Sequence, residues 1–232
     1  MTAVKTRYYV PCVDAFVAGK MTPGAKPSIA DRLWEASRAE FSLRGYHGAR
    51  VQGIARRAGC NVALLYRHWA SKRALYLEVL RTIWSAMLGN VVQLIETGRG
   101  APAVVGAYLD ANLRDPLGAQ IIIREFLDGG PFLNELFEAE PELVAPVRRA
   151  VQAISGEAAP GAPALRPGLD PTLVVLSVGG LAALVASAHE AARPFFAQPV
   201  PAEVWRQHLY DLLLHGVLGC QDQPAGGPPP AA

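Results

Sequence analysis

The sequence is poor in several features that mark large protein classes. It contains three cysteines, Cys12, Cys60 and Cys220, without a Cys-x-x-Cys pair or a neighbouring histidine. Neither a zinc site nor a disulfide framework is expected, and a reducing, cytoplasmic setting fits this usage. Aromatic residues make up only 8%. Together with the many Ala and Leu residues, this favours an all-α fold over a sheet protein.

Long apolar runs are also missing. The longest, Leu173 to Ala188, is interrupted by serine and glycine and falls short of the roughly 20 residues of a membrane span. We interpret it as a buried helix and expect no membrane partner. No secretory signal is recognisable at the N-terminus, so we expect a protein that is not exported.

Catalytic motifs are absent as well. His189-Glu190 starts like a zinc-protease helix, but Arg193 stands where the second histidine belongs. Gly129-Gly130 lacks the further glycines of a phosphate loop, and no Gly-x-Ser-x-Gly occurs. We therefore expect no enzyme, no cofactor and no metal.

Positive charge is concentrated near the N-terminus. Residues 28–76 contain nine Lys/Arg against three acids, a net charge of +6, and residues 1–27 carry +3. Since the whole chain carries +2, residues 77–232 carry −7. This asymmetry indicates a basic, nucleic-acid-facing head on an acidic body. An ordinary solvated surface with segregated charges is the alternative.

The two ends have the composition of irregular segments. Pro11, Pro23, Gly24 and Pro27 interrupt any helix in residues 1–27, so we expect a flexible arm there. Translation from Met21, or a functional basic arm, are both compatible with this composition. Residues 221–232 include three consecutive prolines and predict a disordered tail.

Four helices are expected in residues 28–76 and just beyond. Ser28 and Asp31 form a capping-box-like start for a first helix that stops near Gly45. A short helix from about Arg50 to Ala58 ends at Gly59. Asn61 caps a third helix to about Trp69, and Ser71 caps a long helix from Lys72 into Leu94 or beyond. This order predicts a helix-turn-helix domain over 28–76.

The remaining chain predicts a second helical domain over 77–220. Pro171 directly after Asp170 is a typical helix start. Residues 158–168 predict a surface loop. The helices that we expect span residues 102–114, 117–127, 131–139, 141–155, 171–192 and 202–218.

Residues 28–76 resemble the DNA-binding domain of TetR-family repressors. The resemblance depends on about a dozen positions in fixed order, which makes it far more specific than a single short motif. These positions are Leu33-x-x-Ala36, Phe41-x-x-x-Gly45-Tyr46, Ile54-Ala55-x-x-Ala58-Gly59 and Leu65-Tyr66-x-His68-Trp69-x-Ser71-Lys72-x-x-Leu75.

Much of this resemblance concerns packing, because Phe41, Val51, Ile54, Leu65 and Leu75 would form the centre of the domain. In such a domain the third helix enters the major groove. The resemblance implies that the DNA-facing residues are Arg50, Gln52, Asn61, Val62, Leu64, Tyr66, Arg67, His68 and Lys72. Tyr66 and Lys72 suit phosphate contacts, and Arg67 suits a guanine edge or a phosphate, or is a solvated helix residue.

Two departures from the family pattern affect these expectations. Ala49 and Arg50 stand where the family commonly has a hydroxyl residue, so the usual cap of the second helix is in doubt. The third helix opens with the apolar Val62, Ala63 and Leu64. Apolar side chains can contact thymine methyl groups, which predicts weaker binding when thymine is replaced by uracil at particular positions.

The body is expected to provide dimerisation and ligand binding. One apolar face carries Leu173, Leu176, Gly180 and Leu184, and another carries Leu209, Leu212, Leu213 and Val217. The resemblance implies a four-helix interface between two copies, with Gly179, Gly180, Ala183 and Ala186 allowing close approach; packing within one chain is the alternative. The candidate ligand-binding residues are Trp84, Met87, Tyr108, Asn112, Arg124 and His189.

These observations together predict a ligand-responsive transcriptional regulator. By resemblance it is a repressor that binds a palindromic operator in double-stranded DNA as a homodimer and is released by a small apolar effector. A non-specific or architectural DNA-binding protein without a ligand switch is the alternative. The ratio of specific to random DNA affinity, about a thousandfold or more for specific binders, separates the two.

Overall fold

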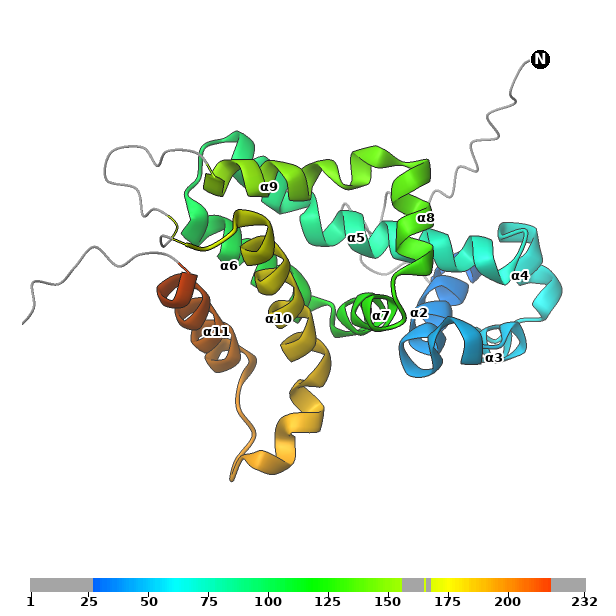
Figure 1. The fold of residues 1–232 in the computed structure, drawn as a ribbon. Helices are drawn as coiled ribbons and strands as arrows, with labels where there is room; N and C mark the ends of the chain where they lie inside the picture. Colours follow the sequence, from blue (N-terminus) through cyan, green and yellow to red (C-terminus); the bar gives the residue numbers. More distant parts are fainter. Residues whose placement is uncertain (1–26, 156–164, 166–167, 218–232) are drawn as a thin grey trace, which may run out of the picture.

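The computed structural model describes residues 27–155, 165 and 168–217 (Figure 1). The predicted tail and all but the last residue of the predicted arm, Met21 included, lie outside this part. The regular elements of the described residues are helices without a β-strand, which confirms the all-α prediction. No described helix is long and apolar enough to cross a membrane. The elements are α2 Ile29–Gly48, α3 Val51–Arg57, α4 Val62–His68, α5 Lys72–Glu96, α6 Ala101–Arg114, α7 Pro116–Leu127, α8 Pro131–Ala139, η1 Pro141–Leu143, α9 Ala145–Ser155, α10 Pro171–Ala192, η2 Arg193–Phe195 and α11 Ala202–Val217.

The predicted capping residues begin the helices as expected. The Ser28 hydroxyl accepts a hydrogen bond from the Asp31 N–H at 3.1 Å, and the Ser28 N–H donates to the Asp31 carboxylate at 2.8 Å. Asn61, Ser71 and Asp170 each accept a backbone N–H of the following first turn at 3.0 Å. These bonds satisfy donors that the first turn of a helix leaves unpaired.

Two glycines with positive φ shape the N-terminal helices. Gly45 has φ 64° and breaks the helical geometry near the end of α2, and Gly59 has φ 67° in the turn between α3 and α4. Residues with a Cβ rarely adopt this conformation, so the short turn of the predicted helix-turn-helix depends on Gly59.

The predicted helix over 141–155 is divided. A 3-10 turn covers Pro141–Leu143, and α9 starts anew at Ala145. Pro146 explains the division, because proline cannot donate the backbone hydrogen bond that would continue a preceding helix.

One hydrophobic core joins the N-terminal helices to the body. Its buried side chains include Phe41 of α2, Leu65 of α4, Leu75 of α5, Ile122 of α7 and Leu133 of α8. Of the predicted domain centre, Val51 is partly buried against this core and the other four residues are buried. The predicted domain boundary between residues 76 and 77 falls within α5, which runs from the N-terminal helices across the body (Figure 1).

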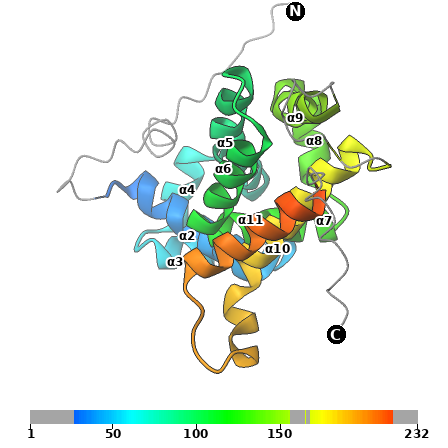
Figure 2. The same ribbon diagram turned by 90° about the vertical axis from the view of Figure 1, so that its left-hand side faces the viewer.

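The two last helices lie at the end of the molecule opposite α2, α3 and α4 (Figure 1). Figure 2, which faces this end, shows α11 in front of α10. Leu209 and Leu213 of α11 are buried with Leu109 of α6, while Ala183 and Ala186 of α10 are buried with Ala119 of α7. Part of each predicted dimer face therefore packs within the chain itself.

Candidate functional site

Helices α3 and α4 present polar and basic side chains to solvent. Among the nine predicted DNA-facing residues, Arg50, Gln52, Asn61, Tyr66, Arg67 and His68 are exposed, while Val62, Leu64 and Lys72 are half-buried. Leu65 of α4 is buried in the core, whereas Tyr66, Arg67 and His68 of the same helix are exposed. The nine predicted residues thus lie on or next to α3, α4 and the start of α5, and none of them is fully buried.

The backbone geometry at the two helix starts differs. Asn61 uses its side-chain oxygen to cap α4, accepting the N–H of Leu64, so its amide nitrogen remains available to face outward. Arg50 precedes α3 without a side-chain capping bond. This agrees with the departure noted in the sequence, where Arg50 replaces a hydroxyl residue.

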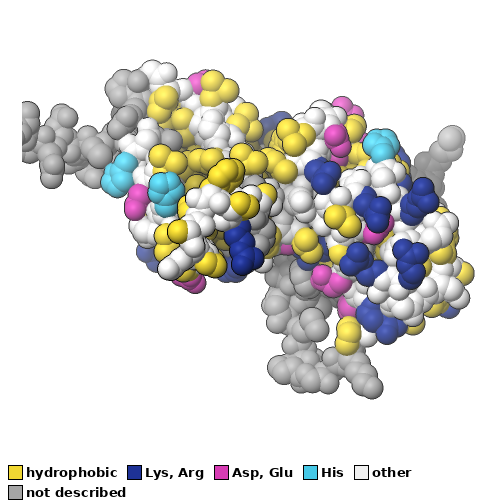
Figure 3. Space-filling model, turned by 90° about the horizontal axis from the view of Figure 1, so that it is seen from below, with side chains coloured by type: hydrophobic (Ala, Val, Ile, Leu, Met, Phe, Trp, Pro, Cys, Tyr) yellow, Lys and Arg dark blue, Asp and Glu magenta, His cyan; other side chains and the backbone are white. Residues whose placement is uncertain are grey.

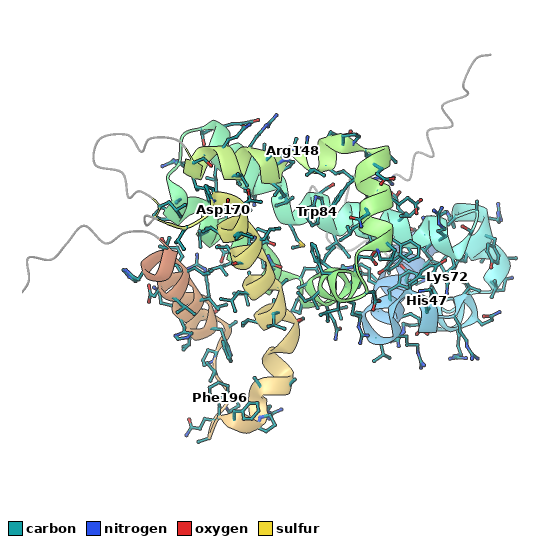
Figure 4. The ribbon with its side chains drawn as sticks, viewed as in Figure 1. His47, Lys72, Trp84, Arg148, Asp170 and Phe196 are labelled. Atoms are coloured by element: carbon teal, nitrogen blue, oxygen red, sulfur yellow. The ribbon has the colours of Figure 1, made fainter. Side chains whose placement is uncertain are left out.

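Lys72 has contacts within the chain that the sequence did not indicate. Its Nζ donates to the backbone oxygens of Tyr46 at 2.8 Å and Ala49 at 3.1 Å, and it lies 4.3 Å from the centre of the Tyr46 ring. Figure 4 shows Lys72 beside His47 at this end of the molecule. The ammonium group therefore fixes the end of α2 against the start of α5, with one of its three N–H donors left for another acceptor.

Charge and apolar surface are separated on the molecule. In Figure 3, Lys and Arg side chains gather over the part formed by α2, α3 and α4, whereas hydrophobic side chains dominate the other part. Such a basic surface attracts the phosphate backbone of nucleic acid, independent of sequence.

The body contains a cavity of about 690 Å³. Its walls are mostly apolar and come from six helices. Examples are Met87 of α5, Val105 of α6, Ile122 of α7, Ala150 of α9, Val178 of α10 and Leu213 of α11. Volume and lining fall within the range of small-molecule sites, which run from about 300 to 1,000 Å³.

The six predicted ligand-binding residues divide into three groups. Trp84, Met87 and Tyr108 line the cavity. Asn112 and Arg124 do not line it, since Asn112 is buried with its amide on the Tyr108 carbonyl and Arg124 reaches α2. His189 belongs to α10, but its side chain lies outside the described part.

The polar groups of the lining are few. The Trp84 indole N–H donates to the Leu143 carbonyl at 2.7 Å, and Figure 4 shows Trp84 within the body, far from Lys72. Burial raises the pKa of the Tyr108 hydroxyl above its ordinary value, so this group is a protonated donor at neutral pH. Arg99 lies between α5 and α6 at the cavity wall and did not stand out in the sequence.

Helix α9 is another part of the site that the sequence analysis missed. Val147, Ala150 and Ile154 line the cavity, yet α9 has no fully buried residue. Their spacing of three and four residues marks one apolar helix face, which was the available signal. A ligand in the cavity would bury this half-exposed face of α9.

A buried carboxylate connects three helices between the cavity and the N-terminal domain. Glu125 of α7 is 2% exposed. It accepts hydrogen bonds from the Tyr76 hydroxyl at 3.0 Å and from the N–H groups of Phe132 at 2.6 Å and Leu133 at 3.2 Å. Burial, and then the Glu125 carboxylate, raise the pKa of Tyr76 far above its usual range. Glu125 thereby caps α8 from a neighbouring helix.

Helix α7 also contacts α2 at two points. The buried Arg38 guanidinium pairs with Asp115, the N-cap of α7. Near the other end, Arg124 donates from Nε to the Ser42 carbonyl at 3.0 Å. The neighbouring residues Ile123 and Phe126 line the cavity. One helix therefore touches both the cavity and the helix that supports α3 and α4.

Large apolar side chains remain exposed on α10 and α11. Leu173, Leu176, Leu184 and Leu212 are each more than half exposed. At the tip between the two helices, Phe195 is 86% exposed, next to Phe196 at the lower end in Figure 4. The side chain of Val217 lies outside the described part. Exposed apolar side chains gathered on two helices in this way suit an interaction surface.

Comparison with known proteins gives one family and several relatives. Residues 33–79 match the family described as bacterial regulatory proteins, tetR family. The chain is 33% identical over 126 residues to the HTH-type transcriptional activator FasR of Mycolicibacterium smegmatis, an alignment that covers 53% of each protein. The chain thus matches about half the length of this relative.

Solved structures share the fold over most of the chain. The ketosteroid transcriptional regulator KstR2 of Mycobacterium tuberculosis superposes with a TM-score of 0.57 at 20% identity, covering 84% of this chain and 98% of KstR2. The transcriptional regulator FadR of Bacillus subtilis, solved in complex with stearoyl-CoA, gives 0.55 at 15% identity, covering 80% and 97%. At these identities the likeness concerns the fold alone.

Proposed function

Because the chain belongs to the TetR family of transcriptional regulators, we propose that it binds a palindromic operator as a homodimer and that a small apolar molecule in the cavity releases it. In this proposal the protein is cytoplasmic, and it represses transcription while it is bound to the operator without ligand. The observation that carries this proposal is α7, which lines the cavity with Ile122, Ile123 and Phe126 and holds α2 through Arg124.

Helix α4 would enter the major groove. Asn61, Tyr66, Arg67 and His68 are exposed on it, and the buried Leu65 fixes its position in the core. Arg67 would contact a guanine edge or a phosphate, and Tyr66 a phosphate. Val62 and Leu64 are half-buried, so their outer atoms remain available for thymine methyl groups.

Backbone contacts would come from residues around α4. Arg50 at the start of α3 and Gln52 in its first turn are exposed, which suits phosphate binding. Lys72 would offer its remaining N–H to a phosphate while it holds the end of α2. These contacts position the protein without reading sequence.

The second copy would cover the exposed leucines of α10 and α11. Leu173, Leu176 and Leu184 form an apolar strip on α10, and each is more than half exposed. A homodimer buries the same strip on both copies, because a two-fold interface is self-complementary. It also spaces two recognition helices for successive major grooves, about 34–36 Å apart.

The ligand would act by favouring a different spacing of these helices. A ligand that binds better to a conformation with wrongly spaced recognition helices lowers the operator affinity of the protein, and the operator lowers the affinity for the ligand by the same factor. A molecule in the cavity would press against Ile122 and Phe126 of α7. Since Arg124 and Asp115 of the same helix hold α2, movement of α7 would carry the DNA-binding helices with it.

The first experiment is selection of bound duplexes from a random library, followed by titration of the recovered site at two salt concentrations. A palindromic site bound about a thousandfold above random DNA is expected. Arg67→Ala should weaken binding to this site, while Arg114→Ala, at an exposed arginine that ends α6 in the body, should leave binding unchanged. Selection without a consensus would overturn specific operator binding and favour the architectural alternative.

A reporter gene placed behind the recovered site tests the direction of regulation. Expression that rises when the regulator is deleted supports repression. Expression that falls would show activation, the activity that the name of the relative FasR describes for that protein.

A further inference from the structure

The lining of the cavity contains a single charged side chain among the described residues, Arg99. We infer, building on the ligand-responsive function proposed above, that the cavity binds an amphipathic molecule with one extended apolar chain and an anionic end. Arg99 binds the anionic end, and the chain runs along α5 toward Trp84.

The position of Arg99 is set by the end of α5. Gly98 has φ 67°, its N–H donates to the Ile95 carbonyl at 3.0 Å, and the Arg99 N–H donates to the Leu94 carbonyl at 2.9 Å. This pair of bonds is a Schellman-type helix ending. The backbone of Arg99 is therefore fixed at the cavity wall, while its side chain is exposed and adjustable.

The charge of Arg99 is uncompensated, unlike that of its neighbours. Arg149 pairs with Glu96 across α9 and α5, and Arg206 pairs with Asp110 of α6. Arg99 forms no ion pair with any residue that the structure describes, and no acidic residue lines the cavity. An anion placed there would gain a partner without displacing an existing one.

The apolar part of the cavity is elongated. Trp84 and Ile95, which both line it, are eleven residues apart on α5 and therefore about 16 Å apart along its axis. Val147 and Ile154 line the opposite side from α9. The Trp84 N–H is already bonded to the Leu143 carbonyl, so the wall at this end is suited to hydrocarbon.

These features distinguish between two classes of apolar ligand. A neutral polycyclic molecule such as a sterol has no anionic group for Arg99, whereas an acyl chain ending in a carboxylate or a phosphate-bearing carrier has one. A guanidinium binds both anions with paired hydrogen bonds. The shared chemistry is an alkyl chain with an anionic end, from either a free fatty acid or an acyl thioester.

The test compares three probes of one chain length on the full chain: dodecanoate, dodecanoyl-CoA and dodecanol. Calorimetry should show that at least one anionic probe binds about tenfold or more tightly than dodecanol, the equivalent of one charge-assisted hydrogen bond. Arg99→Gln should remove this preference and leave dodecanol binding unchanged. The matched control, Arg114→Gln at the other end of α6, should keep the preference.

The outcomes separate this inference from the proposed function. If the binding of dodecanoate alone depends on Arg99, the ligand is a fatty acid. If the binding of dodecanoyl-CoA alone depends on Arg99, the ligand is an acyl thioester. Either result supports the inference. Equal binding of all three probes, an unchanged preference in Arg99→Gln, or binding of none would overturn it. Operator titration of the same preparations tests the regulator function independently of these results.

Discussion

Replacing Glu125 tests whether one carboxylate connects the N-terminal domain with the body. Glu125→Ala removes the acceptor for the N–H groups of Phe132 and Leu133 and for the Tyr76 hydroxyl. Glu125→Gln keeps one oxygen with nearly the same shape. We expect the alanine variant to be much less stable than the glutamine variant.

The magnitudes follow from the bonds that are lost. Gly130 gives α8 no side-chain cap, and Pro131 has no N–H, so Phe132 and Leu133 hold the first available donors. Loss of a helix cap costs about 1 kcal/mol, and a buried hydroxyl without an acceptor costs about 1–3 kcal/mol. Glu125→Ala should therefore lower the free energy of unfolding by about 2–4 kcal/mol. Glu125→Gln should lower it by about 1–2 kcal/mol, because the amide oxygen can still accept from Phe132 and Leu133, while the charge assistance and the acceptor for the Tyr76 hydroxyl are lost.

Urea unfolding followed by circular dichroism measures both values, at one fixed protein concentration because dimer stability depends on concentration. Tyr76→Phe combined with each Glu125 variant gives the coupling between the two side chains. Equal destabilisation by alanine and glutamine, or an effect below about 0.5 kcal/mol for both, would refute the role assigned to the carboxylate.

Three further predictions concern other contacts. Gly118→Ala should destabilise the protein by about 1–3 kcal/mol, because a Cβ would meet the Asp115 carboxylate. Gly89→Ala, with open space around it, should stabilise the protein by about 0.5–1 kcal/mol. Urea unfolding measures both changes, and changes of the same sign would contradict the geometry. Burial and the neighbouring carboxylate raise the pKa of Tyr76, so the folded state keeps a proton that the unfolded state releases above about pH 10. Stability should fall there as the pH rises, and less steeply in Tyr76→Phe; identical pH profiles would rule this out. Arg124→Gln should preserve ligand binding but bring the ratio of operator affinities without and with ligand toward one, as titration of the operator would show; an unchanged ratio would exclude this contact as the connection.

Helix positions were largely predictable from the sequence because caps and breakers are local signals. The helices 131–139 and 171–192 were predicted with the bounds observed, since each begins at a proline and ends near a change in composition. The 141–155 segment was predicted as one helix, and its division at Pro146 was missed. Proline is tolerated in a first turn, so the sequence alone did not decide whether Pro146 began a helix or lay inside one.

The site was predictable only in part. The exposed surface of α4 follows from a motif whose residues are close in sequence. The contacts of Arg124 with Ser42 and of Lys72 with Tyr46 join residues 82 and 26 positions apart, and helical periodicity contains no information about such pairs. Arg99 lacked a signal for the same reason, because its importance comes from the cavity that distant helices form around it.

The shared core has a consequence for the engineering of chimeric regulators. Leu33, Leu75 and Tyr76 pack with Ile121 and Leu133 in one cluster. A fusion that joins residues 28–76 to a foreign sensor would expose this apolar surface and remove the acceptor of Tyr76. The smallest transplantable unit therefore extends through α8, and a designer who wants a shorter one has to rebuild the lost half of the core.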